Sequence, residues 1–501
     1  MVMAQFDYRA DLTNMDFPLL TQEMGRSVLV SSLRDAPSGE RANSPQIYYA
    51  HNVMPTKNGV VSIGYEEKIP APTAGDANIT FDDVRIIFST TTNRVHFAIC
   101  TDGNFYALEE GDTAWRKLTA PAASAGVFVT TGTVNGQTYI YWEGIGAYEY
   151  DEIAHDLAAV VLIGLALGNV IGITASSGYL VAFNALALAW SSTVNPLDFT
   201  PSTVTGAGGG NVADIEGHII FVVPNSLGLL CYTEANTVAA TYTGNLQYPF
   251  KFRGVDNSKG ALGLDQVAYE ANAADHFAYT KGGLQTVSSR KSVNILPETT
   301  DFLAGKQLED FDETTYTFSL TDLTTTMKKK VKLVASRYLV ISYGINTFTH
   351  ALIYDIVLEK LGKLKISHVD VFEYLGNQLE ISKESLAFLS NEGKIEVLKF
   401  SVPTTDRTGV LILGKYQYKR GRHLVLHNIL AENVKSTDSF TCVVLSSVDG
   451  KNNTVVTTTE TVSTGFRQYA ARTSGVNHAV VLKGLFNLST LELIFSLGGS
   501  R

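Results

Sequence analysis

Ten histidines and three cysteines are the side chains of this chain best suited to bind a metal or act as nucleophiles. A zinc hydrolase helix needs two histidines in the pattern His-Glu-x-x-His, and no such pattern occurs. The histidines fall singly and far apart, as at His51, His96, His155, His218 and His276. Cys100, Cys231 and Cys442 lie beside apolar neighbours, without a Cys-x-x-Cys pair. We assign no metal ligand and expect buried, reduced thiols.

The glycine run from Gly206 to Gly210 invites comparison with a phosphate-binding loop. It lacks the Gly-Lys-Ser/Thr ending of the P-loop, and Asn211 stands where a dinucleotide-binding fingerprint needs its last glycine. We expect a flexible loop there. The Gly-x-Ser-x-Gly turn of serine hydrolases is not found in the sequence. The sequence therefore predicts neither a cofactor-binding residue nor a serine nucleophile.

Three acidic clusters could supply the pair of carboxylates that glycosidases place across a sugar site. They are Asp82-Asp83, Glu109-Glu110 and Glu309-Asp310-Asp312-Glu313. Each lies in a turn-like stretch, where charge usually marks solvated surface. Spatial pairing cannot be derived from the residues, so no catalytic residue is assigned.

One basic run occurs, Met327-Lys328-Lys329-Lys330-Val331-Lys332, and it leads directly into an expected strand, Val331 to Ala335. A solvated strand end is the simplest interpretation. Four ammonium groups so close together could instead contact phosphate or an acidic partner, in a manner that salt would screen. Whether Lys328 to Lys332 meets DNA stays open.

Composition indicates a folded chain that does not wrap nucleic acid. Apolar residues make up 45% and charged residues 18% of the 501 residues. The formal net charge of −10 is unfavourable for many phosphate contacts. Met1 to Asp11 carries Asp7, Arg9 and Asp11 where an export signal needs an apolar core. We therefore expect synthesis in a cytoplasm without secretion.

Leu157 to Leu197 contains no Asp, Glu, Lys or Arg and raises the question of a membrane span. Glycines interrupt it at short intervals, at Gly164, Gly168, Gly172 and Gly178. Two buried strands are expected instead.

The elements that hold these side chains are expected to be β-strands, because short strands joined by glycine turns recur along the chain. Val95 to Cys100 turns through Asp102-Gly103-Asn104 into Phe105 to Leu108, and Tyr139 to Trp142 turns through Gly144 and Gly146 into Tyr148 to Tyr150. Further hairpins of this kind start near Tyr179, Ile219, His276, Tyr338 and Leu386. Their spacing is that of four-stranded blades, so we predict a β-propeller of six to eight blades.

The predicted organisation has three parts. Residues 1–72 are turn-rich and form an irregular N-terminal arm or docking segment. Residues 73–407 form the β-propeller. Residues 408–501 contain longer alternating strands and form a β-sandwich accessory domain. The expected strands of this domain are Val410 to Leu413, His423 to Leu430, Phe440 to Ser446 and Ala479 to Leu485.

Four stretches resemble the tail-nozzle proteins of short-tailed bacteriophages, also described as tail-hub or packaged-DNA stabilisation proteins. The first is Asn52-Val53-Met54-Pro55 with Lys57-Asn58-Gly59-Val60, and the second is Ala189-Trp190-Ser191-Ser192 with Pro196-Leu197-Asp198-Phe199. The third comprises Asn236-Thr237-Val238, Tyr242-Thr243-Gly244, Ser258-Lys259-Gly260, and His276-Phe277-Ala278-Tyr279-Thr280 with Gly283-Leu284-Gln285. The fourth is Gly475-Val476-Asn477-His478-Ala479-Val480 with Lys483-Gly484-Leu485-Phe486.

This resemblance implies a structural virion protein without enzymatic activity. The family resemblance implies a ring of identical subunits, of six copies, that closes the tail channel and conducts double-stranded DNA during ejection without binding it specifically. Its expected partners are other copies of itself, tail adaptor or portal-proximal proteins and tail fibres, and its expected location is the virion tail. An acidic channel wall would repel phosphates within about one Debye length, roughly 8 to 10 Å. The alternative is a propeller that binds or cleaves host surface glycans.

Overall fold

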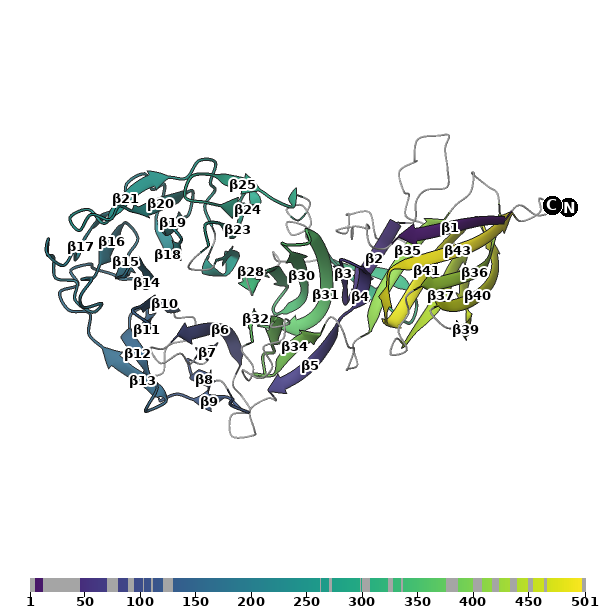
Figure 1. The fold of residues 1–501 in the computed structure, drawn as a ribbon, viewed down its shortest axis with the longest axis horizontal. Helices are drawn as coiled ribbons and strands as arrows, with labels where there is room; N and C mark the ends of the chain where they lie inside the picture. Colours follow the sequence, from purple (N-terminus) through teal and green to yellow (C-terminus); the bar gives the residue numbers. More distant parts are fainter. Residues whose placement is uncertain are drawn as a thin grey trace.

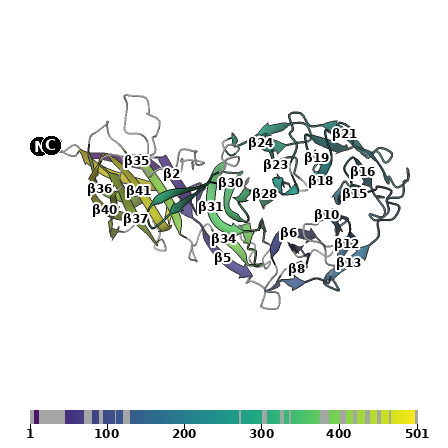
Figure 2. The ribbon, with the colours of Figure 1, turned by 180° about the vertical axis from the view of Figure 1, so that it is seen from behind.

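The structure is a computed structural model of a chain built almost entirely of antiparallel strands. It forms a ring of sheets beside a two-sheet sandwich (Figure 1), and the view from behind shows the same two units (Figure 2). The predicted all-β class is confirmed. The described residues are 5–11, 46–69, 80–88, 94–101, 103–109, 111–119, 129–261, 263–269, 273–297, 299, 307–322, 328–334, 337–374, 386–399, 408–416, 423–432, 439–448, 454–463 and 466–497.

In the part of the chain that the structure describes, seven blades make up the ring: six four-stranded sheets and the first four strands of a seven-stranded sheet. Blades 1 and 2 consist of β6 (Phe81–Phe88), β7 (Arg94–Cys100), β8 (Phe105–Glu109) and β9 (Arg116–Lys117), and of β10 (Val129–Val134), β11 (Gln137–Trp142), β12 (Gly146–Asp151) and β13 (Asp156–Val160). Blades 3 and 4 consist of β14 (Gly172–Ser176), β15 (Tyr179–Phe183), β16 (Ala187–Trp190) and β17 (Gly208–Asn211), and of β18 (Ile219–Asn225), β19 (Gly228–Thr233), β20 (Thr237–Tyr242) and β21 (Phe250–Gly254).

The remaining blades complete the circle. Blade 5 has a short 3-10 helix, η1 (Leu264–Gln266), before its first strand. Its strands are β22 (Val267–Ala268), β23 (His276–Thr280), β24 (Gly283–Val287) and β25 (Ser292–Asn294). Blade 6 consists of β28 (Lys328–Val334), β29 (Tyr338–Gly344), β30 (Phe348–Asp355) and β31 (Lys360–His368), and blade 7 of β32 (Asp370–Glu373), β33 (Leu386–Leu389), β34 (Ile395–Lys399) and β5 (Gly64–Ile69). The predicted propeller is confirmed, with seven blades.

Each blade contains one of the seven hairpins that the sequence predicts. The pairs are β7–β8, β11–β12, β15–β16, β18–β19, β23–β24, β29–β30 and β33–β34. Glycine with positive φ occupies several of these turns, including Gly103 (φ 81°) and Gly228 (φ 147°). At Gly228 a Cβ would lie 2.2 Å from the Ala240 carbonyl oxygen, so only glycine fits.

The ring closes with a strand from the other end of the propeller sequence. β5 pairs with β34 in the register Lys399↔Gly64 to Ile395↔Ile69. Across this closure, Trp115 of blade 1 donates its indole N–H to the Gly393 carbonyl of blade 7 at 2.8 Å. Blades 1 and 7 therefore meet through this side-chain hydrogen bond and a shared apolar core.

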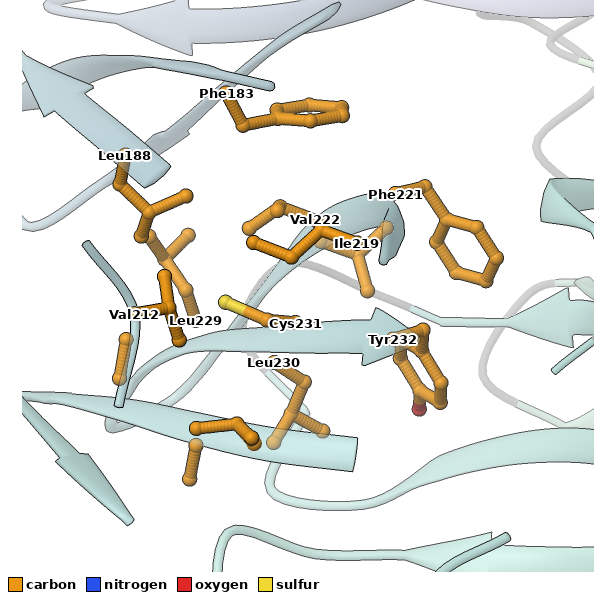
Figure 3. Packing of buried hydrophobic residues seen from close by; sticks show 14 of the residues in the cluster. Phe183, Leu188, Val212, Ile219, Phe221, Val222, Leu229, Leu230, Cys231 and Tyr232 are labelled. Atoms are coloured by element: carbon orange, nitrogen blue, oxygen red, sulfur yellow. The ribbon is translucent and has the colours of Figure 1, made fainter. Parts of the chain in front are cut away.

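Apolar side chains between neighbouring blades form the core of the ring. Figure 3 shows the cluster of blades 3 to 5, in which Phe183, Phe221 and Tyr232 are fully buried. Burial of each such side chain contributes about 1.5–3 kcal/mol. Cys231 lies in this cluster, where burial raises the pKa of its thiol to about 12. All three cysteines are buried thiols outside any disulfide, as predicted.

The sandwich has two five-stranded sheets that face each other across one core. The first contains β1 (Gln5–Asp11), β43 (Thr490–Leu497), β36 (Leu424–Glu432), β40 (Phe466–Gly475) and β39 (Thr459–Ser463). The second contains β2 (Gln46–His51), β35 (Gly409–Tyr416), β41 (Asn477–Leu485), β37 (Ser439–Ser447) and β38 (Thr454–Thr457). The four strands expected between 408 and 501 are present.

Residues before 72 contribute strands to both units, which the sequence did not predict. β1 and β2 each form one edge of a sandwich sheet. β3 (Val53–Thr56) and β4 (Gly59–Ser62) extend the sheet of blade 6, and β42 (Asn487–Leu488) of the sandwich pairs with β4. One sheet therefore runs from the propeller axis into the sandwich. The docking role predicted for 1–72 stays a prediction, and residues 12–45 lie outside the described part.

A hairpin inserted between blades 5 and 6 reaches the sandwich. It consists of β26 (Gln307–Asp312) and β27 (Thr317–Asp322). Phe311 packs against Tyr49 of β2, with ring centroids 5.4 Å apart, and joins the apolar cluster on the outer face of the second sandwich sheet. We call this hairpin the latch hairpin.

The uncharged segment Leu157 to Leu197 begins with most of β13 of blade 2 and then supplies the first three strands of blade 3. It forms three largely buried strands, β14, β15 and β16, where two were predicted, because Gly178 provides an additional tight turn at φ 83°. Among the described residues, no helix is long and apolar enough to cross a membrane.

Candidate functional site

The basic run forms β28, the first strand of blade 6, and its lysines have different environments. Lys328 is exposed, as a solvated strand end predicts. Lys330 is buried, with its Nζ 3.2 Å from Oδ1 of Asp370, and the Lys332 Nζ lies 3.0 Å from Oδ2 of the same carboxylate. Asp370 begins blade 7 and is fully buried. The solvated interpretation is wrong for Lys330, because this charge joins two blades.

The acidic clusters are used in separate structural contacts. Asp82 is exposed at the start of blade 1. Asp312 accepts a hydrogen bond from the backbone N–H of Thr314 at 2.7 Å, and such backbone bonds lower the pKa of Asp312. Glu110 and the side chains of Asp83, Glu309 and Asp310 lie outside the described part. The described members do not supply a paired-carboxylate site.

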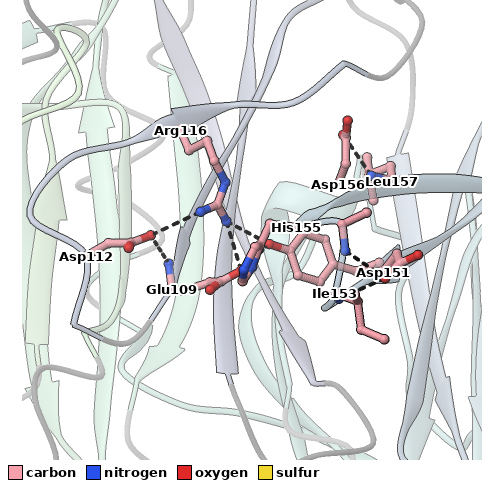
Figure 4. A network of polar contacts seen from close by, with 10 residues as sticks. Glu109, Asp112, Arg116, Asp151, Ile153, His155, Asp156 and Leu157 are labelled. Carbon is pink, nitrogen blue, oxygen red and sulfur yellow. Dashed lines mark hydrogen bonds and ion pairs between the residues drawn. The ribbon is translucent and has the colours of Figure 1, made fainter.

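Glu109 is the centre of a polar network between the outer strands of blades 1 and 2 (Figure 4). Its Oε1 accepts hydrogen bonds from the Tyr150 hydroxyl at 2.5 Å and from Arg116 at 2.8 Å, and it lies 2.8 Å from Nδ1 of His155. Arg116 also donates to the Tyr150 hydroxyl at 2.9 Å. Asp156 of β13 accepts from Thr119 near β9, which adds a second link between the two blades.

The electrostatics of this network favour an ion pair over a proton-transfer site. Burial alone would raise the pKa of Glu109, but hydrogen bonds from Tyr150 and His155 and the charge of Arg116 outweigh burial and lower it. Burial and the neighbouring carboxylate of Glu109 raise the pKa of Tyr150. Glu109 therefore stays ionised and Tyr150 stays protonated near neutrality, so the network joins two blades.

The glycine run does not form the predicted flexible loop. Gly208 to Gly210 lie in β17, which pairs with β16 in the register Trp190↔Gly208 to Ala187↔Asn211. A Cβ at Gly209 would lie 2.9 Å from the Leu188 carbonyl oxygen, so a bare backbone suits this close strand pairing. Gly208 to Gly210 therefore form an extended edge strand and not a loop that opens a helix, as a phosphate-binding loop does.

Several histidines are buried structural residues, as their isolated positions predict. His276 lies 3.2 Å from the Tyr232 hydroxyl through Nδ1 and 3.0 Å from the Pro224 carbonyl through Nε2. Burial lowers the pKa of His276 to about 4 and that of His96 to about 3. No group of three potential metal ligands was found among the described residues.

Glu313 of the latch hairpin binds three residues of the sandwich. Its Oε1 lies 3.1 Å from Nε2 of His51 on β2, and its Oε2 accepts a hydrogen bond from Thr408 at 3.2 Å. The same Oε2 lies 2.9 Å from Nζ of Lys483 on β41. One carboxylate therefore bridges β2, the residue before β35, and β41, and it holds the latch hairpin on the sandwich.

The protonation states of this latch follow from its contacts. Hydrogen bonding from His51 and Lys483 lowers the pKa of Glu313 to about 2, despite partial burial. Burial lowers the pKa of His51. A neutral His51 that donates a hydrogen bond through Nε2 to Glu313 can accept a hydrogen bond at Nδ1 from the Tyr49 hydroxyl, 3.0 Å away. The latch is thus satisfied with an ionised glutamate and a neutral histidine.

Asn52 connects the sandwich to blade 6 at the first residue of the family-like stretches. Its backbone has a φ of 53°, which asparagine tolerates better than most residues. Its N–H donates to the Lys363 carbonyl at 2.9 Å, and its Oδ1 accepts from the Lys365 N–H at 2.9 Å. Its Nδ2 donates to the Thr408 carbonyl at 3.2 Å. A single side chain thus joins β31 to the start of β35.

Gly59 belongs to the same family-like stretch and lies where the sandwich touches β4. Its φ is 131°, and a Cβ there would lie 2.0 Å from the Leu488 carbonyl oxygen of β42. Next to it, Val60 pairs with Leu488, and the Ser62 N–H donates to the Phe486 carbonyl at 2.8 Å. Only glycine permits this approach of the two units.

The other family-like stretches also occupy packing positions. Ser191 accepts a hydrogen bond from the Leu180 N–H at 2.9 Å within blade 3. A Cβ at Gly260 would lie 2.1 Å from the Glu234 carbonyl oxygen of blade 4. His478 is buried in the sandwich, 3.1 Å from the Leu424 carbonyl oxygen. The stretches therefore mark joints within and between blades and sheets.

Comparison with known proteins adds no functional assignment. No family model matches the sequence, and no curated protein matches it. Among solved structures, one described as "YCF48 bound to D1 peptide" is similar at a TM-score of 0.37 and 10% identity, with 68% of this chain and 97% of that chain covered. A similarity of this size carries no argument, so the description of the fold rests on the strand pairing.

Sequence reasoning missed the latch. In the sequence, His51 is an isolated histidine and Glu313 belongs to an acidic cluster, and neither pattern indicates a contact between them. Their separation of 262 residues hides the contact. His51 ends the strand Gln46–His51, and a buried polar side chain needs a hydrogen-bond partner. That requirement is the signal that could have indicated the contact.

Proposed function

We propose that the chain is a structural subunit of a short phage tail, which assembles into a ring that closes the tail channel and conducts DNA during ejection. The observation that carries this proposal is the position of the first family-like stretch. Asn52 and Gly59 form the joint between propeller and sandwich. A stretch that resembles the nozzle family therefore lies at the joint between propeller and sandwich, where Asn52 and Gly59 cannot readily be replaced by other residues.

Mechanical coupling within the chain supports this role. One sheet runs from blade 6 through β3 and β4 to β42, and the latch hairpin adds a second connection from the propeller to the sandwich. Two separate connections resist rotation about either one. A subunit that must keep its shape while DNA passes through a ring needs such stiffness.

Electron microscopy of the purified chain and of virions tests the proposal. Closed rings of this protein at the distal end of the tail are the expected result. A chain that stays monomeric in solution and is absent from tails overturns it. A screen against host surface polysaccharides provides the counter-test, because cleavage that a carboxylate substitution abolishes would establish the glycan-directed alternative.

A further inference from the structure

Exposed apolar side chains gather on blades 2 to 4. Large apolar residues are normally exposed singly, and a concentration of them marks an interaction surface. Asp198 is the one charged residue in the sequence between positions 157 and 213. The exposed members in this region are Ile145, Ile153, Val161, Ile163, Leu186, Val194, Val204, Leu227, Tyr242, Leu246 and Tyr248.

The outer edge of blade 3 differs from those of blades 4 and 7, and resembles the short uncharged edge strand of blade 5, Ser-Val-Asn. An outermost strand has unpaired backbone groups, and proteins usually protect them with charged side chains. β5 carries Glu66, Glu67 and Lys68, and β21 carries Lys251 and Arg253. β17 has the sequence Gly-Gly-Gly-Asn and carries no charge. Its outer edge is therefore open to another strand.

Exposed apolar residues lie at both ends of β17. Val194 and Val204 flank its start on a loop closed by the Thr193 N–H bond to the Thr205 carbonyl at 3.1 Å. Leu246 of the neighbouring blade contacts the same loop near Gly206. Leu186 lies at the other end, where its carbonyl accepts the Val212 N–H at 3.0 Å. A strand added along β17 would meet apolar contacts at each end.

A second unprotected edge lies on the sandwich. β38, Thr454–Thr457, has the sequence Thr-Val-Val-Thr and is the terminal strand of its sheet. Val456 packs against the sandwich core, whereas Val455 is 46% exposed. Val448, at the end of β37, is also exposed. β-branched residues without charge favour strand pairing, and β38 has four residues, as β17 does.

The two edges belong to opposite ends of the molecule. β17 lies on the side of the ring farthest from the sandwich (Figure 1). A contact between two different surfaces of identical subunits is heterologous, and repetition of it closes into a ring when the rotation permits. Each copy has a formal net charge of −10, so an uncharged contact minimises repulsion between copies.

We propose that β38 of one copy adds to the outer edge of β17 of the next copy, so that the ring is joined by an intermolecular sheet. The partner is a second copy of this chain, which rests on the proposed function. Strand addition supplies main-chain hydrogen bonds, and the apolar side chains around both edges supply the remaining contact area.

Cysteine cross-linking tests the contact directly. The full chain with Gly210→Cys and Val455→Cys is treated with a short bis-maleimide, and the three native cysteines are buried thiols outside any disulfide. A Cβ at Gly210 meets no atom within 4 Å, so this variant should fold. Covalent dimers and higher species are expected. A control pair of Gly210→Cys with Val357→Cys, an exposed residue of blade 6, should give monomer.

Charge on either edge should block assembly without unfolding the chain. Gly210→Lys and Val455→Lys are each expected to weaken association by about ten-fold or more, whereas Val357→Lys leaves it unchanged. Mass photometry gives the oligomer distribution, and circular dichroism confirms the fold. Rings that persist in both edge variants, or the lack of any cross-link above the control, overturn this contact.

The outcomes separate this contact from the proposed function. Rings of wild-type protein in tails without the β17–β38 cross-link reject the contact and leave the tail role standing. A cross-linked assembly of a protein that is absent from virions supports the contact and rejects the tail role.

Discussion

The side of the propeller that carries the sandwich and the opposite side, blades 2 to 4, use their surfaces differently. On the sandwich side, charged groups such as Asp370 and Glu313 are buried or half-buried and bind residues of other elements. On the opposite side, the sequence between positions 157 and 213, which includes blade 3, has one charged residue, Asp198, and apolar side chains such as Val204 are exposed. The described polar groups on the sandwich side thus have partners within the chain, whereas the apolar side chains on the opposite side are exposed, which motivates the proposed contact between copies.

The comparison also explains why the blades are not equivalent. Blade 6 continues through β3 and β4 into the sandwich, so its outer edge is occupied. Blade 7 receives β5, which carries charges at its exposed edge. Blade 3 ends in β17, without charge. The outer edges of these three blades therefore differ: one is covered by further strands, one carries charge and one is uncharged.

Asp370→Asn should produce the largest loss of stability on the sandwich side. The neutral amide leaves the buried Lys330 and the half-buried Lys332 without their shared carboxylate. Removal of one partner from a buried ion pair lowers stability by about 3–5 kcal/mol. Urea unfolding measures the effect. Lys328→Gln on the same strand is the control and should stay near wild type; equal effects of both variants would contradict a special role for the pair.

Gly59→Ala should come next, because two unfavourable effects coincide. The alanine must adopt a φ of 131° and would bring its Cβ within 2.0 Å of the Leu488 carbonyl oxygen. We expect a loss of about 2–4 kcal/mol, measured by thermal or urea unfolding. Gly210→Ala on the opposite side has open space and should change stability by less than about 0.5 kcal/mol. Similar losses in both variants would remove the contrast between the sides.

Glu313→Gln should have a smaller effect, about 1–2 kcal/mol, because a neutral amide retains part of the hydrogen bonding but loses the charge opposite Lys483. Hydrogen exchange in β26 and β27 should rise before exchange in the blades does. Lys483→Gln removes the other charge and should reproduce the loss, and the double variant should cost less than the sum.

The pH dependence of the latch has a defined sign. The pKa of Glu313 is lowered from 4.5 to about 2, so its stabilisation is complete above pH 4.5 and is lost as pH falls towards 2. The lowered pKa of His51 means that the unfolded chain binds a proton more readily below pH 6.5, which also reduces stability in acid. Protection factors of the latch-hairpin amides, which correct for the slower intrinsic exchange in acid, should fall below pH 6.5, and Glu313→Gln should flatten the part below pH 4.5.

Val204→Lys on the open side should have the smallest effect on folding, within about 0.5 kcal/mol, because its side chain is already exposed. Self-association should weaken in sedimentation velocity runs. A large loss of stability from this substitution would mean that blade 3 depends on this side chain within the monomer.

Contacts between residues close in sequence could be predicted, whereas contacts between residues far apart in sequence could not. Hairpins such as Val95 to Leu108 are local, and turn glycines indicate them, so all seven blades could be recognised. β5 pairs with β34, which lies more than three hundred residues later in the sequence. The residues Gly64–Ile69 do not themselves indicate which strand they pair with. The acidic residues around Glu313 have the composition of a solvated turn, and only the folded arrangement brings His51 and Lys483 to them.

The pairing of β1 with β43 has a consequence for biosynthesis. Gln5 pairs with Ser496, so β1 has to wait until the ribosome has made a strand that lies almost five hundred positions later. At about 5–20 residues per second, this interval is on the order of 25–100 s. During it the early strands remain without their partners, in the form that chaperones capture. Nascent chains of this protein should therefore occupy such factors until β43 has been made.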